Sequence, residues 1–204
     1  MTLRRDFPTF EQWQAAGSPQ GPGVFRSASG SLVNILTPSA DQVRLDDIAR
    51  SLSRQCRFGG HLAPHVEIYS VAQHSVFVSY AVPHDLALVG LLHDAAETFL
   101  QDLIKPNKLV LASDLYKMLE REWAWSIGQV FGVGSALCEL PAVVKLADNR
   151  ALATEQRDLV LHATLDYDPY PKTITPLDLP SQSYALFMDR FRELIGVHPR
   201  AQVT

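Results

Sequence analysis

Four side chains constrain the fold of this chain most strongly: His74, the adjacent pair His93 and Asp94, and Asp148. Each interrupts an apolar stretch with helical periodicity. A carboxylate in an apolar setting, as is expected for Asp94, costs several kcal/mol unless a partner or a metal ion compensates for its lost hydration. Two imidazoles and two carboxylates can hold one divalent cation. The sequence therefore predicts separate helices that converge on one metal site, as helical proteins commonly build such sites.

The apolar periodicity predicts an all-α domain of six or seven helices, with a short N-terminal β-hairpin within residues 24–36. Asp46, Ser113 and Ser181 are suitable N-cap residues, and a proline-rich stretch over 163–180 is expected to be irregular. The expected helices cover residues 46–55, 70–80, 85–99, 113–132, 141–161 and 181–196.

Length and composition favour one cytoplasmic domain. A chain of 204 residues is long enough to bury a core, and 47% hydrophobic with 20% charged residues is typical of globular proteins. The longest apolar run, residues 86–92, is too short to span a membrane, and no apolar signal core follows the first residues. Cys56 and Cys138 are far apart and are expected to be reduced thiols.

The charge pattern favours a small anion over a polymer. A net charge of −4 argues against a nucleic-acid polymer as partner, because such domains are normally basic on one face. The basic side chains nevertheless gather locally, which is typical of a pocket for a small anionic ligand. They are Arg44, Arg50, Arg54 and Arg57, followed by Lys105 and Lys108. Of these, Arg44, Arg50 and Arg54 are expected to form a solvated helix face.

The spacing around the His-Asp pair predicts hydrolytic chemistry. On one continuous helix, His93 and Glu97 would share a face, one turn apart, with Asp94 about 100° further round. Four protein ligands on a six-coordinate ion leave room for water and a substrate oxygen, and the ion would then activate the water and polarise a phosphoryl group. Glu97, which is not needed as a ligand, suits general acid-base work. A single helix histidine is more often a core or surface residue, so the prediction rests on the combination.

The sequence around these side chains resembles the HD-domain phosphohydrolases. Within them it is similar to the bacterial 5′-deoxynucleotidase branch and to related phage deoxynucleoside (dATP-type) triphosphohydrolases. Residues 69–74, 91–97 and 145–148, with the order His…His-Asp…Asp, carry the superfamily resemblance. The segment 57–61 and the run 97–108 carry the similarity to the nucleotidase branch.

The resemblance implies a metal site and an acid. It assigns one divalent ion, Mn, Co, Zn, Fe or Mg, to the ligands His74, His93, Asp94 and Asp148. Asp94 and Glu97 would be the catalytic residues, and Glu97 would act as general acid or position the attacking water. A metal ion held in this way is an expected cofactor, and a nucleotide is the expected small-molecule partner.

The resemblance also implies a substrate pocket. Arg57 would contact phosphate, a role that suits its planar guanidinium. Phe58 stands where the deoxynucleotidases usually carry Trp, near the sugar or base. Asp102 and Lys108 would line the pocket, and His61 would face the phosphate or stabilise the loop.

These expectations define one HD-type domain over residues 1–204, with a family core at about 32–160 and with 1–31 and 163–204 peripheral. The expected reaction is hydrolysis of a deoxynucleoside mono- or triphosphate to the deoxynucleoside plus phosphate or polyphosphate. Alternatives are hydrolysis of a signalling nucleotide, or a non-catalytic nucleotide-sensing module with a structural metal. The resemblance further implies a homo-oligomer, for which the long helix around Trp123 offers an apolar face.

Overall fold

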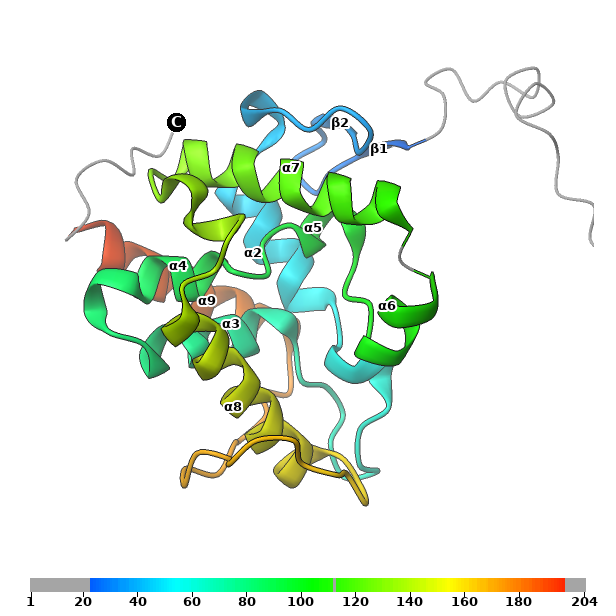
Figure 1. Cartoon of the computed structure of the whole chain (residues 1–204), viewed down its shortest axis with the longest axis vertical. Coiled ribbons are helices and arrows are strands. Elements are labelled where there is room, and N and C mark those ends of the chain that lie inside the picture. Colours follow the sequence, from blue (N-terminus) through cyan, green and yellow to red (C-terminus); the bar gives the residue numbers. More distant parts are fainter. Residues whose placement is uncertain (1–22, 112, 197–204) are drawn as a thin grey trace, which may run out of the picture.

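Helices make up most of the structure (Figure 1), a computed structural model that describes residues 23–111 and 113–196. The strands β1 (Val24–Arg26) and β2 (Leu32–Asn34) pair antiparallel, and the helices are α2 (Leu45–Arg54), α3 (Val71–Ala81), α4 (Ala87–Leu92), α5 (Glu97–Leu100), α6 (Lys105–Leu111), α7 (Asp114–Val130), α8 (Ala142–Leu159) and α9 (Pro180–Ile195). The all-α class and the N-terminal hairpin are confirmed. No helix within these described ranges has the length and apolar character needed to cross a bilayer.

Helix α3 lies at the centre of the packing. It contacts α2, α4, α8 and α9. Its side chains are buried on nearly every face, from Val71 to Val78, as expected for a helix that is apolar all round. The central position explains how one polar side chain of α3, His74, comes to lie inside the core.

A glycine lets α4 approach α3 closely. A Cβ atom built at Gly90 would lie 3.1 Å from the Cα of Ser79, which is tighter than most real contacts. Because His93 follows Gly90 by three residues, this close approach also carries His93 towards α3. The sequence position of the glycine therefore helps to set the geometry of the predicted metal site.

The predicted continuous helix over 85–99 is wrong. Helix α4 ends before a turn at residues 93–96, and α5 begins at Glu97. Within the turn the N–H of Glu97 donates to the carbonyl of Asp94 at 3.0 Å, an i to i−3 bond of the 3₁₀ type. Residues three apart eclipse in that conformation, so Asp94, rather than His93, lies on the same side as Glu97.

Two of the three predicted N-caps are wrong. Asp46 lies inside the first turn of α2, where its Oδ2 atom accepts from Nε of Arg50 at 2.6 Å. Ser181 lies inside α9, which begins at Pro180, a residue that suits the first helical position. The cap at Ser113 is confirmed by its side chain, which accepts a backbone N–H in the first turn of α7.

Helix α9 belongs to the core, although residues 163–204 were expected to be peripheral. Phe187, Phe191 and Leu194 are fully buried, and α9 packs on α2, α3 and α4. Their spacing of four and three residues forms one apolar helix face. The part of the peripheral segment beyond residue 196, like residues 1–22, lies outside the described residues.

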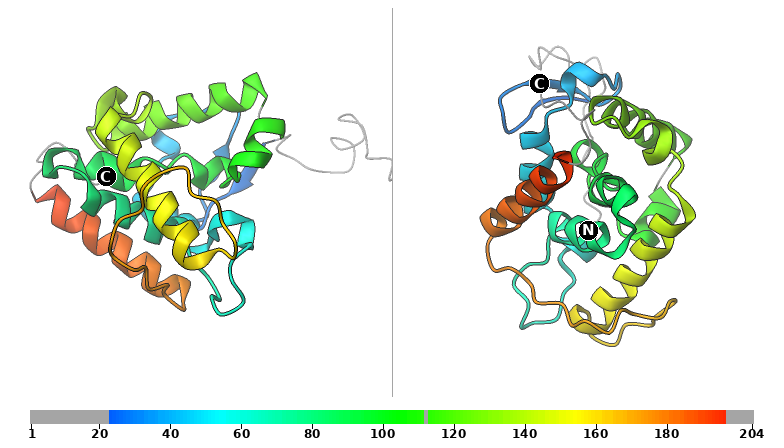
Figure 2. Two further views of the ribbon diagram at one scale, coloured as in Figure 1. Left: turned by 60° about the horizontal axis from the view of Figure 1, so that its bottom comes forward. Right: turned by 90° about the vertical axis from the view of Figure 1, so that its left-hand side faces the viewer.

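The proline-rich stretch predicted over 163–180 is irregular up to residue 179, where α9 follows, and it passes beside the C-terminal end of α8 (Figure 2). Side chains of the neighbouring helices hold its backbone. Arg157 of α8 donates to the carbonyl of Tyr170 at 2.8 Å, and Gln73 of α3 donates to the carbonyl of Thr175 at 2.7 Å. The stretch is therefore attached to both helices that supply predicted metal ligands.

Candidate metal centre

The predicted ligands come together from three elements. His74 is on α3, His93 and Asp94 are in the turn after α4, and Asp148 is on α8. His74, His93 and Asp94 form a group whose ligand atoms lie within 4.8 Å of one another and that could hold a metal ion. Asp148 adds an Oδ1 atom 3.1 Å from Nε2 of His74 and 3.6 Å from Nε2 of His93.

The separations suit a single ion. Nε2 of His74 lies 3.2 Å from Nε2 of His93, and Nε2 of His93 lies 3.2 Å from Oδ2 of Asp94. Ligand atoms about 2.1 Å from one ion are about 3.0 to 3.4 Å apart in octahedral or tetrahedral geometry. The four side chains therefore already stand near the spacing that a bound ion would require.

The second nitrogen of each histidine is engaged by an oxygen atom. Nδ1 of His93 lies 2.8 Å from the carbonyl of Gly90, and Nδ1 of His74 lies 2.6 Å from Oε1 of Glu155. Oxygen acceptors of this kind require the proton on Nδ1, so each neutral imidazole presents an Nε2 lone pair to the centre. Two lone pairs 3.2 Å apart repel one another unless a cation or a proton lies between them.

The electrostatics of the cluster favour positive charge. Burial disfavours a charged imidazole, but Asp94 and Asp148 outweigh it and raise the pKa of His93 well above its usual value. Burial likewise opposes ionisation of Asp94, yet the two histidines lower its pKa to about 2. The negative charge of these carboxylates favours an extra proton on an imidazole, and it equally favours a divalent cation in the place of that proton.

Glu155 is a site residue that the sequence analysis missed. It is fully buried on α8 and contacts three groups: Nδ1 of His74 at 2.6 Å, the hydroxyl of Tyr69 at 3.1 Å and Nη2 of Arg57 at 3.3 Å. Burial opposes its ionisation, but His74 and Arg57 lower its pKa. A carboxylate two helical turns after Asp148, on the same face, was the available signal.

Arg57 contacts the proposed ligand Asp94 and the supporting residue Glu155. Its guanidinium is buried, with Nη1 3.6 Å from Oδ2 of Asp94 and Nη2 3.3 Å from Glu155. The contact with phosphate that the resemblance implies stays a prediction. The next residue, Phe58, has a φ of +57°, a left-handed conformation that is strained for a bulky side chain.

Glu97 lies beside the ligands and is partly buried. Burial, Asp94 and Asp102 together raise its pKa well above the usual value, so the side chain favours the protonated form. Among the described residues its Oε2 atom has no hydrogen-bond partner. Gln55, another residue that the sequence analysis missed, donates to the carbonyl of Glu97 at 3.0 Å and accepts from the N–H of Asp102 at 2.9 Å. The side-chain amide of Gln55 therefore contacts both ends of the segment from Glu97 to Asp102.

A cleft of about 700 Å³ opens at the metal centre, between α6, α7 and α8. Lys108, predicted to line the substrate pocket, lies in it and pairs with Glu120. Lys145 also lines it, one turn before Asp148 on the same face of α8, and has no ion-pair partner within the described residues. The remaining predicted substrate residues lie outside the lining: Arg57, Phe58, His61 and Asp102. Of these, His61 is exposed.

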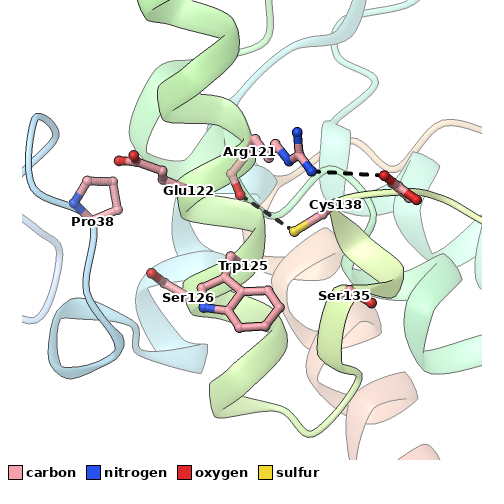
Figure 3. Close-up of a pocket in the computed structure, with 8 residues that line it drawn as sticks. Pro38, Arg121, Glu122, Trp125, Ser126, Ser135 and Cys138 are labelled. Atoms are coloured by element: carbon pink, nitrogen blue, oxygen red, sulfur yellow. Dashed lines mark hydrogen bonds and ion pairs between the residues drawn. The ribbon is translucent and has the colours of Figure 1, made fainter.

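A second hollow, of about 560 Å³, lies beside α7 and contains none of the predicted ligands (Figure 3). Trp125 faces it and is 51% exposed, whereas Trp123 is fully buried and stacks on Phe99. Cys138 also lines it and donates to a backbone carbonyl of α7. Both Cys56 and Cys138 are free thiols, as predicted.

Comparison with known proteins identifies related sequences. No family model matches the chain. A protein of Escherichia coli (strain K12), described as uncharacterized protein YfdR, is 38% identical over 160 residues, which is 76% of this chain and 85% of the relative. A protein of Rhodobacter capsulatus, described as uncharacterized protein RCAP_rcc00048, is 30% identical over 129 residues, or 60% of this chain and 63% of the relative. The extent of the first match shows that this chain belongs to the same family as YfdR.

Proposed function

We propose that this protein is a metal-dependent phosphohydrolase that acts on deoxynucleotides. It would hydrolyse a deoxynucleoside mono- or triphosphate to the deoxynucleoside plus phosphate or polyphosphate. The observation that carries the proposal is the facing pair of Nε2 atoms of His74 and His93, 3.2 Å apart, beside the carboxylates of Asp94 and Asp148. The resemblance to the HD-domain phosphohydrolases supports the choice of a nucleotide as substrate.

The donor set fits one divalent ion. Two imidazole nitrogens and two carboxylate oxygens favour Mn, Co, Fe or Zn over Mg, which prefers oxygen ligands alone. A bound ion would lower the pKa of a coordinated water and polarise a phosphoryl oxygen. The contacts of Glu155 and Gly90 with the histidines are the kind that orient ligands and fix their tautomers.

The protein's own side chains would manage charge and protons around the substrate. Glu97, held protonated by burial and by neighbouring carboxylates, can donate a proton to the leaving oxygen. Lys108 and Lys145 lie in the cleft, where their ammonium groups can neutralise phosphate charge. A volume of about 700 Å³ accommodates one nucleotide.

Product analysis tests the proposal. The purified protein is incubated with Mn²⁺ or Co²⁺ and each deoxynucleoside mono- and triphosphate, and the released phosphate species are separated. Orthophosphate from monophosphates identifies a 5′-deoxynucleotidase, whereas intact tripolyphosphate identifies a triphosphohydrolase. Metal binding without turnover of any of these substrates contradicts the proposal and favours a sensing module or a signalling nucleotide.

Glu97→Gln provides the matched variant for this experiment. It keeps the size of the side chain and leaves the four proposed ligands in place, so metal content should be unchanged while turnover is lost. Full turnover in this variant contradicts the assignment of Glu97 as the acid.

A further inference from the structure

A pocket of about 630 Å³, which shares no lining residue with the cleft, lies between α3, α9 and residues 170–175. Its lining is mainly apolar and includes the aromatic rings of Tyr69, Phe77, Tyr80 and Tyr170. Phe77 of α3 and Tyr170 of the irregular stretch pack edge to face, with ring centroids 5.6 Å apart. Such a volume and lining are typical of sites for one small molecule.

The charge of this pocket differs from that of the cleft. No aspartate or glutamate lines it, and Lys172 is the one charged side chain among its lining residues. Lys172 is exposed and forms no ion pair within the described part of the chain. An aromatic wall with a single unpaired cation complements a planar molecule that carries negative charge.

The pocket adjoins the residues that position the metal ligands. Tyr69 is one of its lining residues, and the hydroxyl of Tyr69 donates to Oε1 of Glu155 at 3.1 Å. The same Oε1 atom lies 2.6 Å from Nδ1 of His74. An occupant that shifts the ring of Tyr69 would therefore act on the carboxylate that orients a proposed metal ligand.

We propose that this pocket binds a small aromatic anion, and that its occupancy changes the affinity of the centre at His74 for a divalent metal. The proposal rests on metal binding, one part of the proposed function, and does not depend on hydrolysis. Binding at two separate sites that affects one another must be reciprocal, so each ligand changes the affinity for the other by the same factor.

The first experiment uses 1-anilinonaphthalene-8-sulfonate, a fluorescent aromatic anion, as the probe of the pocket in the metal-free protein. We expect saturable binding of one molecule per chain, weakened at least fivefold by Lys172→Glu. Arg44→Glu, an equal charge change at an exposed side chain by the N-terminal hairpin, should alter the affinity less than twofold. No saturable binding, or equal weakening by both variants, overturns the proposal.

The second experiment measures the Mn²⁺ dissociation constant by electron paramagnetic resonance of free Mn²⁺, with and without saturating probe. We expect a shift of about fivefold or more, as is typical of coupled sites. Tyr69→Phe keeps the ring and removes the hydroxyl, so it should retain probe binding and reduce the shift to less than twofold. Probe binding with no shift in the wild-type protein overturns the proposal. Failure of Mn²⁺ to bind without probe refutes the proposed function as well, whereas loss of the shift alone leaves that function intact.

Discussion

The two ends of the proposed site are built in different ways. At the metal end, His74 and His93 come from closely packed helices and each has its Nδ1 atom fixed by an oxygen. At the proposed substrate end, the cleft is lined by exposed, charged side chains, and the predicted substrate residue Phe58, outside that lining, has a left-handed backbone conformation. The comparison leads us to expect a preorganised metal centre beside a proposed substrate surface with fewer buried contacts.

Removing a proposed ligand should have the largest effect. Asp148→Asn replaces a carboxylate that lies 3.1 Å from Nε2 of His74, and we expect metal affinity to fall by more than about 100-fold, the upper range for residues that only orient ligands. Turnover should be lost with it. Metal content by elemental analysis and phosphate release provide the measurements, with the exposed Asp178→Asn as control. Retention of both metal and rate would remove Asp148 from the ligand set.

Glu155→Gln tests whether the metal end depends on its buried support. The variant keeps the shape but weakens the bond to His74 and removes the buried partner of Arg57, so metal affinity should fall about 10- to 100-fold. Stability should fall by about 3 kcal/mol, because breaking a buried pair leaves a charge uncompensated. Mn²⁺ titration and chemical denaturation measure the two effects. Glu67→Gln, at an exposed glutamate that forms no ion pair within the described residues, should change neither in a comparable way.

Gly90→Ala tests the close approach of α3 and α4. The added methyl group would lie 3.1 Å from the Cα of Ser79, so we expect a loss of about 1 to 3 kcal/mol in the free energy of unfolding. Metal affinity should also fall, because the approach sets the distance from His93 to His74. Gly196→Ala is the matched control, since its methyl group would lie 3.7 Å from the backbone oxygen of Glu193, an ordinary contact. Equal unfolding energies for the two variants would contradict this role of Gly90.

Glu97 lies between the metal end and the proposed substrate end, and the stability of Glu97→Gln as a function of pH tests its protonation state. The pKa of Glu97 is raised in the folded protein above its value in the unfolded chain, near 4.5. The stability that the protonated Glu97 side chain contributes is therefore fully present below pH 4.5 and is lost as the pH rises through the pKa of the folded state. In the metal-free protein, the variant should therefore gain stability relative to wild type as pH rises above 4.5, and the two should converge at lower pH. Denaturant midpoints at a series of pH values measure the difference in stability between the variant and the wild type. A difference that stays constant with pH would contradict the raised pKa of Glu97.

The sequence predicted the metal end better than the substrate end for a physical reason. Helical periodicity and polar interruptions of apolar helices are local signals, and they indicated His74, His93, Asp94 and Asp148, which the structure brings close together. The support from Glu155 and Gln55 depends on contacts between residues 42 to 98 positions apart, which no local pattern encodes. The break at residues 93–96 was missed because a 3₁₀ turn and an α-helix share nearly the same apolar spacing over one turn.

Phe58→Gly should have the smallest effect on stability and would sharpen the comparison most directly. Glycine relieves the cost of a left-handed backbone, about 1 kcal/mol, but adds a similar entropy to the unfolded chain, so the net change should stay within about 1 kcal/mol. Metal affinity should be unchanged, because Phe58 supplies no proposed ligand and its ring lies beside the guanidinium of Arg57. If the substrate end depends on this ring, KM for the best deoxynucleotide should rise severalfold while Mn²⁺ binding stays constant. A loss of metal affinity in this variant would show that the loop and the metal centre form one rigid unit, which is the opposite of the division drawn above.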